Sequence, residues 1–575
     1  MTYLDQLRAA SGLRDLAKIL TVKPKTLSFL IYKVPVADRY YSFEIPKSSG
    51  GTRKIDAPIP QLSMIQRRLA NVLTACVLEI EKSEPVKSHL AHGYLPKRSI
   101  LTNARNHKKR RFVFNIDLKD FFPSLNFGRV RGYFIADARF NLHKDVATII
   151  AQISCHQNSL PQGSPCSPIL SNLLTNFLDV RIARLAKDKK VTYSRYVDDI
   201  TFSTNAKFFP EAIAIQSTVT SNVWDVGNKL AKQVSRAGFT INKSKTRMQL
   251  RGSRQTATGL MLNAKVNIRP EYYRDTRSMA HNLFKSGMAY KKSSATLSGG
   301  PKTLISSLEP VNLNQVEGRL NHIAYIKDAA DLRTESEKKK SHDGITKLAE
   351  KFKFFRLFVS LDRPLLITEG PTDYIYIREA IKSRTAFHPA LTQLTPTGHD
   401  FSIRFLHYKK RLDRLMHLGG GSSDLAKFIG TYEKNIERYA YQPMAFPVIV
   451  LVDNDKGGSV TFGPVMKKCK GVAPALETTN SFYRVTKNLY LIKTPEKAPK
   501  PDSCIEDLFD PALLTTKIGG LDFDPDKKHQ EHGKYGKHIF ADKVVRAGAS
   551  KIDFSGFDPL LDRIVDAISD YAASP

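Results

Sequence analysis

The amino-acid sequence predicts two folded parts, an α+β part followed by an α/β part with a mainly parallel sheet. Length is the first observation, because 575 residues exceed what one hydrophobic core usually organises. The second is that residues 1–322 mix helical patterns with short β-rich runs, whereas residues 361–575 alternate apolar runs with helical stretches. Third, residues 323–360 are highly charged with sparse apolar positions, which predicts a solvated, partly helical connector.

The composition indicates a globular protein with an anionic partner. Hydrophobic residues make up 41% of the chain, a share compatible with packed cores. Lysine and arginine number 89 against 55 acidic residues, which gives a formal net charge of +34. Such an excess favours nucleic acid, because binding to phosphates releases condensed counterions. A membrane surface would attract the same charge, so charge alone leaves both partners open.

Neither a secretion signal nor a membrane span is expected. Residues 1–20 are charged and periodic, which predicts an amphipathic helix rather than a signal peptide. No apolar stretch approaches the roughly 18–20 residues that a span needs. The five scattered cysteines form no C-x-x-C pair, so they predict neither a disulfide framework nor a zinc site. We therefore expect a soluble protein of the cytoplasm with no membrane partner.

Acidic residues of the first part stand at the ends of predicted strands. The apolar run at 111–116 predicts a strand that ends at Asp117. The runs at 192–197 and 200–204 predict a hairpin with Asp198 and Asp199 at its turn. Further along the chain, the predicted irregular segments are a turn at 161–165 that leads into an apolar helix and a flexible loop at 293–303.

These three aspartates are candidates for a metal centre that joins nucleotides. Polymerisation uses two divalent cations about 3.5–4 Å apart, and magnesium prefers carboxylate oxygens. Asp117, Asp198 and Asp199 would come from separate strands and meet at one place. Aspartate pairs also occur in turns for their local hydrogen bonds, so the pair alone is a weak signal.

Several motifs in a fixed order make residues 40–265 similar to the reverse transcriptase family. The resemblance implies a right-hand polymerase of fingers, palm and thumb, with the thumb from about residue 265, that uses dNTPs and Mg²⁺ or Mn²⁺. It makes Asp117, Asp198 and Asp199 the catalytic metal ligands, and Phe122 the aromatic gate that excludes a ribose 2′-hydroxyl. The other nucleotide-binding residues that it implies are Arg53 and Lys54 in the fingers, Gln162 and Gly163 in the template loop, and Lys245 near the triphosphate.

Two further elements resemble the bacterial retron branch of that family. Residues 103–107 match an Asn-Ala-x-x-His element through Asn103 and His107, and residues 257–259 match a Val-Thr-Gly element through Thr258 and Gly259, with alanine in place of valine. A helix histidine satisfied inside the protein is the alternative for His107. The resemblance implies a cognate non-coding RNA as partner, RNA contacts by these residues, and a branched RNA–DNA product called msDNA.

Basic residues interleaved with aromatic ones follow this element. Residues 269–292 include Arg274 and Arg277 beside several tyrosines and lysines. Rings and guanidinium planes stack on unpaired bases, so this stretch is a candidate RNA-binding thumb. The alternative is a solvated helix face.

A second acidic set lies in the C-terminal part. Apolar runs before Glu369 and Asp453 predict parallel strands, with Asp373 one turn into a following helix and Asp455 two residues beyond Asp453. The carboxyl ends of parallel strands are where α/β sheets bind ligands. Together these acids can coordinate one or two magnesium ions, although a single acid at a strand end is an ordinary turn former.

This acidic pattern resembles the Toprim domain of topoisomerases, primases and OLD-family nucleases. Residues 369–373 match its first motif, residues 453–455 its second, and residues 418–423 the glycine-bearing loop between them. The resemblance implies Mg-dependent phosphodiester hydrolysis with Glu506 as an additional metal ligand. Lys537 is assigned the catalytic cation, with Lys534 as the alternative.

Joined in one chain, the two resemblances imply a retron polymerase fused to a nuclease effector. They imply anti-phage defence in which the RNA–msDNA restrains the nuclease until a phage activity releases it. Whether its target is DNA, messenger RNA or transfer RNA stays open, as does a homo-oligomer. The alternatives are a group II intron-like reverse transcriptase with a DNA-processing C-terminal part, and a ribonucleoprotein scaffold whose Toprim fold binds nucleic acid without cutting it.

Overall fold

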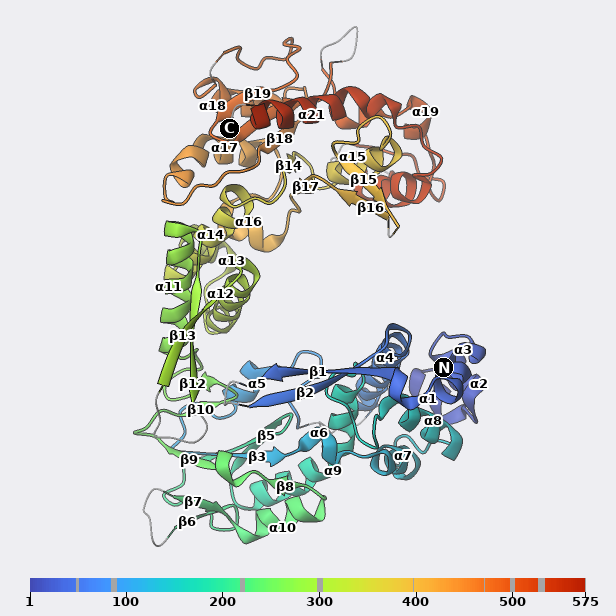
Figure 1. Cartoon of the computed structure of the whole chain (residues 1–575), viewed down its shortest axis with the longest axis vertical. Helices are drawn as coiled ribbons and strands as arrows, with labels where there is room; N and C mark the ends of the chain where they lie inside the picture. Colours follow the sequence, from blue (N-terminus) through green and yellow to red (C-terminus); the bar gives the residue numbers. More distant parts are fainter. Residues whose placement is uncertain are drawn as a thin grey trace. The chain divides into compact units, whose positions relative to one another are not determined.

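The computed structural model describes residues 1–47, 51–83, 90–217, 223–296, 304–396, 398–469, 471–496, 502–525 and 533–573. Its internal contacts divide the chain into two compact units, both drawn in Figure 1. Unit 1 comprises Met1–Tyr273, Ser294–Ser307 and Ile326–Ala330. Unit 2 comprises Arg274–Ser293, Leu308–Tyr325 and Asp331–Pro575.

Unit 1 is built around an antiparallel sheet with strand order β4-β5-β3-β8, in which β9 also pairs with β3. The strands are β3 (Phe112–Lys119), β4 (Thr192–Tyr196), β5 (Asp199–Thr204), β8 (Thr240–Ile241) and β9 (Arg247–Leu250). The predicted strand before Asp117 and the predicted hairpin around residues 198–199 are therefore confirmed. Their apolar runs are short and bounded by polar residues, which is the pattern of a strand rather than a helix.

Long helices cover this sheet and form the core of unit 1 with it. They are α4 (Pro60–Ser83), α7 (Phe127–Ala136), α8 (Lys144–Ser154) and α9 (Ser167–Asp188). Helix α9 is buried over most of its length, including polar side chains such as Asn172 and Thr175. It starts directly after the turn at 161–165, as predicted, with Pro168 in its first turn.

Smaller elements complete unit 1. They are α1 (Tyr3–Ala9), α2 (Leu13–Ile19), α3 (Pro24–Ser28), β1 (Tyr40–Pro46), β2 (Thr52–Pro58), α5 (Ile100–Arg105), α6 (Phe121–Ser124), β6 (Ala214–Gln216), β7 (Trp224–Val226), α10 (Asn228–Arg236), β10 (Thr256–Ala257) and β11 (Leu260–Met261). The single N-terminal helix expected from residues 1–20 is wrong, because Gly12 has an extended backbone (φ −169°) between α1 and α2. Glycine interrupts a helix readily because it loses most conformational freedom there.

Unit 2 contains a five-stranded sheet of order β17-β14-β18-β20-β19 (Figure 1). Its strands are β14 (Leu365–Thr368), β17 (Arg404–Phe405), β18 (Val448–Val452), β19 (Tyr483–Thr486) and β20 (Leu489–Lys493). All neighbours are parallel except β19 and β20, so the predicted mainly parallel sheet is confirmed. Every side chain of β18 is buried, as expected for a parallel strand covered on both faces.

The helices of unit 2 cover both faces of this sheet. The further elements of this unit are α13 (Glu335–Lys340), α14 (Gly344–Phe354), α15 (Asp373–Ser383), the β15–β16 hairpin (Thr392–Thr395 and Gly398–Phe401), α16 (Lys410–Met416), α17 (Ser422–Ile436), α18 (Phe462–Met466), α19 (Pro511–Leu514), α20 (Lys537–Ile539) and α21 (Asp558–Ala573). Ile449 and Leu451 of β18 share one core cluster with residues of α15 and α21. The alternate residues Val448 and Val450 are also buried and face the opposite side.

The packing boundary between the units differs from the domain limit expected at residue 322. Helix α11 (Pro270–Ser286) lies mainly in unit 2, as does most of α12 (Leu313–Asp328). The cause is aromatic packing: the Phe284 ring lies 5.5 Å from that of Phe355 and 5.3 Å from that of Tyr439. The connector is helical as predicted, but its end is not solvated, because Phe352 and Phe358 are buried.

The loop predicted at 293–303 begins later than expected, because residues 293–296 belong to a strand. Strand β12 (Tyr290–Thr296) pairs with β13 (Leu304–Pro310), and residues 297–303 lie outside the described residues. Within the part of the chain that the structure describes, no helix is both long and apolar enough to cross a bilayer.

Candidate active sites

The three predicted polymerase aspartates meet at one end of the sheet of unit 1. Asp117 of β3 lies directly opposite Asp199 of β5 in the antiparallel register. Asp198 sits in the turn before β5, and its carbonyl accepts a hydrogen bond from the Leu118 N–H at 3.1 Å. Val197 has a left-handed backbone (φ 59°), which makes the tight turn between β4 and β5.

Crowded carboxylates give this site its electrostatics. Burial, then repulsion from Asp198 and Asp117, raises the pKa of Asp199 to about 6. Burial and the charge of Asp117 also raise the pKa of Asp198. The ammonium of Lys245 contacts Asp117 Oδ2 at 2.9 Å, so one cation already balances part of the negative charge.

A buried ion pair holds the turn that carries Asp198. Arg195 of β4 and Asp179 of α9 are almost fully buried and joined at 2.7 Å. Another Arg195 nitrogen donates to the Val197 carbonyl at 2.9 Å. This pair was not among the residues predicted from the sequence, where Arg195 stands between Ser194 and Tyr196 and looks like an ordinary exposed strand residue.

The template loop packs against the fingers strand β2. The Asp56 N–H donates to the Gln162 carbonyl at 2.9 Å. Gly163 has φ 134°, and a Cβ there would lie 2.6 Å from the Asp56 carbonyl oxygen, so only glycine fits this approach. Arg53 and Lys54 are exposed on the same strand. The template loop thus contacts β2 within three residues of Arg53 and Lys54, and their shared role in nucleotide binding stays a prediction.

Phe122 lies in α6, five residues after Asp117. Its ring is half-buried and stands edge-on to Phe121 at 5.4 Å between centroids. This contact limits the movement of the ring, as a steric gate requires. Its role as the gate that excludes a ribose 2′-hydroxyl stays a prediction.

Direct RNA contacts by Asn103 and His107 do not fit the structure. Both side chains are fully buried. His107 bridges two strands, with Nδ1 2.7 Å from Ser203 Oγ of β5 and Nε2 2.7 Å from Ser194 Oγ of β4. Ser194 in turn donates to Asn103 Oδ1 at 2.6 Å. Asn103 and His107 therefore support the β4–β5 hairpin from inside the protein. For His107, the structure agrees with the alternative of a buried histidine whose hydrogen bonds are satisfied.

The other predicted RNA-binding residues are accessible. Thr258 and Gly259 form the two-residue turn between β10 and β11, with φ of 47° and 82°. The Thr258 hydroxyl donates to the Ile100 carbonyl at 3.4 Å, so this turn rests on the start of α5. Arg274 and Arg277 are exposed on α11, within unit 2.

The acids of unit 2 gather at the carboxyl ends of β14 and β18. The Asp453 N–H donates to Glu369 Oε2 at 3.3 Å. Burial, then the charges of Asp373, Glu506 and Glu369, raises the pKa of Asp453 to about 8. Burial and the charge of Asp455 also raise the pKa of Glu369. The sequence analysis predicted this convergence of acids from two strand ends.

Asp373 and Glu506 extend this cluster. Asp373 is the first residue of α15, not one turn into it as predicted, and it accepts the Gly370 N–H at 2.6 Å. A Cβ at Gly370 would lie 2.6 Å from that carboxylate, so a larger residue there would require the Asp373 side chain to shift. Burial, then the charge of Glu506, raises the pKa of Asp373 to about 6.

The structure separates the two lysine candidates. Lys537 contacts both oxygens of buried Glu506, at 2.9 and 3.0 Å. Burial would lower the pKa of Lys537, but Glu506, Asp373 and Asp453 raise it, so the ammonium stays charged. Lys534 pairs instead with Asp524 at 3.2 Å. Lys537 is therefore the cation of the acidic cluster.

Asp455 and the glycine-bearing loop flank the cluster. Asp455 accepts the Gly458 N–H at 2.6 Å and is half-buried. The Gly421 N–H donates to the Glu369 carbonyl at 2.9 Å, immediately before α17 begins at Ser422. The loop thus fixes the backbone of Glu369.

Both clusters have the donor chemistry that magnesium prefers, namely carboxylate oxygens without sulfur or imidazole. Burial, and after it the repulsion between like charges, raises the pKa values of Asp199 and Asp453, and a divalent cation would relieve that repulsion. Among the described residues, no three acidic, histidine or cysteine side chains are already arranged to hold a metal ion. The carboxylates suit a magnesium ion because of their oxygen donors and their closely spaced negative charges. Their side chains would have to turn toward the ion to bind it.

Residues 45–268 match the family model described as "Reverse transcriptase (RNA-dependent DNA polymerase)". Retron Mx65 reverse transcriptase of Myxococcus xanthus is 36% identical over 43% of this chain and 56% of its own length. Retron Mx162 reverse transcriptase of the same organism is 33% identical over 50% and 60%. The chain thus spans somewhat more than half the length of these two curated relatives.

A solved apo telomerase from Candida tropicalis has 15% sequence identity and a TM-score of 0.31 over 55% of this chain and 57% of its own. At that TM-score the likeness identifies no shared fold. Retron Ec86 reverse transcriptase of Escherichia coli is 30% identical over 48% of this chain and 78% of its own length. With its aspartates converging as the motif order predicts, this chain belongs to the retron reverse transcriptases.

Proposed function

We propose that unit 1 synthesises DNA on an RNA template and makes msDNA from a cognate non-coding RNA. The observation that carries this proposal is the register that places Asp117 opposite Asp199, with Asp198 in the adjoining turn. Membership of the retron reverse transcriptases supports both the template and the product. The substrates are dNTPs, and the cation is Mg²⁺, with Mn²⁺ as a substitute.

Different residues of unit 1 have different roles in nucleotide addition. Asp117, Asp198 and Asp199 hold the cations, which when bound supply charge neutralisation at the triphosphate and an activated 3′-hydroxyl. Lys245 sits against Asp117 and can meet the triphosphate, since it lies at the same edge. The other roles are phosphate contact by Arg53 and Lys54, template and nucleotide alignment by Gln162 and Gly163, and exclusion of the 2′-hydroxyl by Phe122.

The residues that would contact RNA are accessible to solvent. The exposed guanidiniums of Arg274 and Arg277 suit phosphates and unpaired bases. The Thr258–Gly259 turn exposes its backbone beside α5 and offers it to RNA. Asn103 and His107 act on RNA only indirectly, through the hairpin that they brace.

Primer extension on an RNA template tests the polymerase. Asp198→Asn should lower turnover by at least about 10²-fold, because one metal-holding charge is lost. Asp225→Asn, an exposed residue of β7, is the matched control and should retain full activity. Equal activity in both variants would remove Asp198 from the site.

We further propose that unit 2 is a Toprim-like nuclease of the OLD type. The support is the cluster that joins Glu369, Asp453 and Asp373 with the paired Glu506 and Lys537. Glu369, Asp453, Asp455, Asp373 and Glu506 would hold Mg²⁺, which when bound activates water for phosphodiester hydrolysis. Lys537 would stabilise the negative charge that develops on the phosphate.

Cleavage of DNA, messenger RNA and transfer RNA by the purified chain tests this second site. Glu369→Gln should lower cleavage at least about 10²-fold, while Glu437→Gln at the end of α17 should not. Binding without cutting is the second candidate, favoured by the lack of a ready three-ligand arrangement among the described residues. Absence of cleavage from the wild type supports the second candidate, whereas cleavage that persists in Glu369→Gln would remove Glu369 from the site.

Polymerase and nuclease activities in one chain suggest a role in anti-phage defence in the bacterial cytoplasm. In this proposal the RNA–msDNA particle restrains unit 2, and a phage activity that damages msDNA releases it. Cutting host nucleic acid would then stop growth before phage replication finishes. Assembly as a homo-oligomer is part of the same proposal and is tested by the mass of the purified particle.

A further inference from the structure

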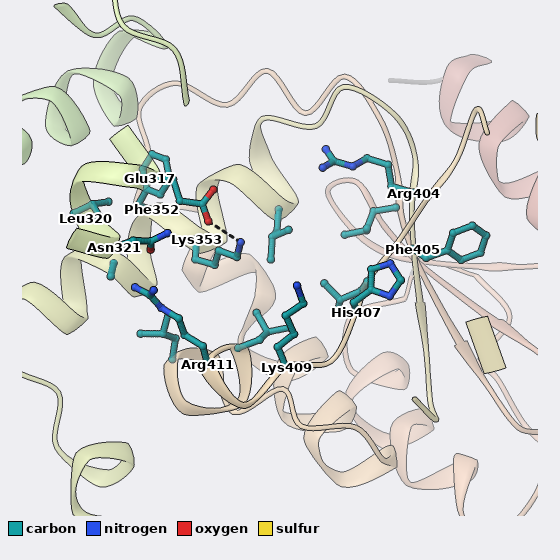
Figure 2. A pocket seen from close by; sticks show the side chains of 16 residues that line it. Glu317, Leu320, Asn321, Phe352, Lys353, Arg404, Phe405, His407, Lys409 and Arg411 are labelled. Atoms are coloured by element: carbon teal, nitrogen blue, oxygen red, sulfur yellow. Dashed lines mark hydrogen bonds and ion pairs between the residues drawn. The ribbon is translucent and has the colours of Figure 1, made fainter. Parts of the chain in front are cut away.

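A pocket of about 430 Å³ lies in unit 2, and none of the acids of the acidic cluster lines it. Figure 2 shows the side chains that do. Helices α12, α14 and α16 and the segment from Arg404 to Lys409 form its walls. The volume is in the range of sites for small molecules and cofactors, about 300–1,000 Å³. All the residues that line it belong to unit 2.

The polar wall of this pocket is strongly cationic. Lys353, Arg404, Lys409 and Arg411 line it against one acid, Glu317. Figure 2 shows the Lys353 and Lys409 amines and the Arg404 guanidinium pointing toward one central space. Such a cluster costs free energy through mutual repulsion unless an anion offsets it.

The acid of the pocket is already neutralised by protein partners. Glu317 Oε1 contacts Lys353 at 3.0 Å, and its second oxygen pairs with Arg356. Arg404 contacts Asp362 at 2.6 Å, but that carboxylate is 72% exposed and screened by solvent. The charged side chains that line the pocket are thus four cations and one acid, and Lys409 and Arg411 are exposed at its rim.

Apolar side chains also line the pocket. Leu320, Leu412 and Leu415, here called the leucine wall, line it together with Phe352. These side chains have few exposed atoms of their own. Apolar side chains next to cations match a ligand with a flat ring at one end and phosphates at the other.

We propose that this pocket binds a phosphorylated ligand of nucleotide size. Its phosphates contact Arg404, Lys409 and Arg411, and its ring lies against the leucine wall. Guanidinium groups suit this role because their planar forks bind phosphate oxygens in pairs. The discrete volume favours a mononucleotide over a nucleic-acid strand, which needs a continuous groove with exposed aromatic platforms.

A ligand bound in this pocket would affect the acidic cluster through residues that connect the two sites. Leu365, which lines the pocket, begins β14, and β14 ends just before Glu369. On the other side, the hydroxyl of Tyr408 donates to the carbonyl of Thr368, the residue next to Glu369. Binding itself does not depend on the nuclease assignment, so either proposal can fail alone.

Isothermal titration of the full-length chain, freed of nucleic acid and kept in EDTA, tests the proposal with ATP, tripolyphosphate and adenosine as probes. ATP should bind, tripolyphosphate should bind at least about tenfold more weakly, and adenosine should bind weakest. Lys409→Glu with Arg411→Glu should weaken ATP binding at least about tenfold. The matched control, Lys543→Glu with Lys551→Glu, changes the charge of unit 2 equally at exposed residues outside the pocket and should bind normally.

Two outcomes overturn the proposal. One is equal ATP binding in the pocket variant and the control. The other is tight binding of a single-stranded oligonucleotide with none of ATP. If the double variant unfolds, Arg411→Gln replaces it, and a loss of about threefold or more relative to Lys551→Gln is then the expected result.

Discussion

At the two proposed metal sites, protons compete with the cation for Asp199 and Asp453. Their pKa values are raised to about 6 and about 8, and a protonated carboxyl cannot hold a cation. The Mg²⁺ concentration for half-maximal polymerisation should therefore rise as pH falls below about 6. For cleavage it should rise already below about 8, by up to about tenfold per pH unit. Magnesium titrations of both reactions across this range check the order, and an identical pH dependence of the two would contradict it.

His107 is a second residue whose protonation has a measurable consequence. Burial lowers its pKa to about 3, whereas the unfolded chain has the ordinary value near 6.5. Only the unfolded state takes up the proton between these values, so stability falls as pH decreases from about 6.5 toward 3. Between pH 6 and pH 5 the loss should be about 1 kcal/mol.

His107→Gln removes this titration but leaves hydrogen-bonding groups for Ser194 and Ser203. Denaturant unfolding at several pH values should show a flatter pH dependence in the variant. Parallel curves for wild type and variant would mean that His107 is not held neutral in the fold.

The β4–β5 hairpin is the element on which polymerisation depends most. Its turn is tied to α9 through Arg195 and Asp179. Arg195→Met alone should destabilise unit 1 by about 3–5 kcal/mol, because it leaves Asp179 buried without its cation. Combining it with Asp179→Leu should restore much of that loss.

Thermal unfolding and primer extension separate the two consequences of that change. The double variant should fold yet extend primers slowly, since the Val197 carbonyl has lost its donor. Full activity in a stable double variant would show that the ion pair serves stability alone.

Single strands were predictable where the pattern is local. Apolar runs of strand length identified β3, β14 and β18, and the motif order identified Asp117 and Asp453. The packing of α11 was not predictable, because Phe284 meets Phe355 and Tyr439 from far along the chain. The burial of Asn103 and His107 was not predictable either, because a polar motif has the same sequence whether its side chains are buried or exposed.

The whole molecule is expected to act as a polymerase whose product restrains its second unit. In cells that carry the cognate RNA, Asp198→Asn should remove msDNA and slow growth through released nuclease. Adding Glu369→Gln to that variant should restore growth. Normal growth of Asp198→Asn cells with intact cleavage activity in vitro would argue against restraint by msDNA.

The central claim is DNA synthesis on the cognate RNA at the aspartates of unit 1. It is tested most directly by sequencing the nucleic acid that co-purifies with the protein from cells. The account predicts DNA joined covalently to RNA in the wild type and in Asp225→Asn, and none in Asp198→Asn. Branched DNA in undiminished amount from Asp198→Asn, or none from the wild type, would contradict it.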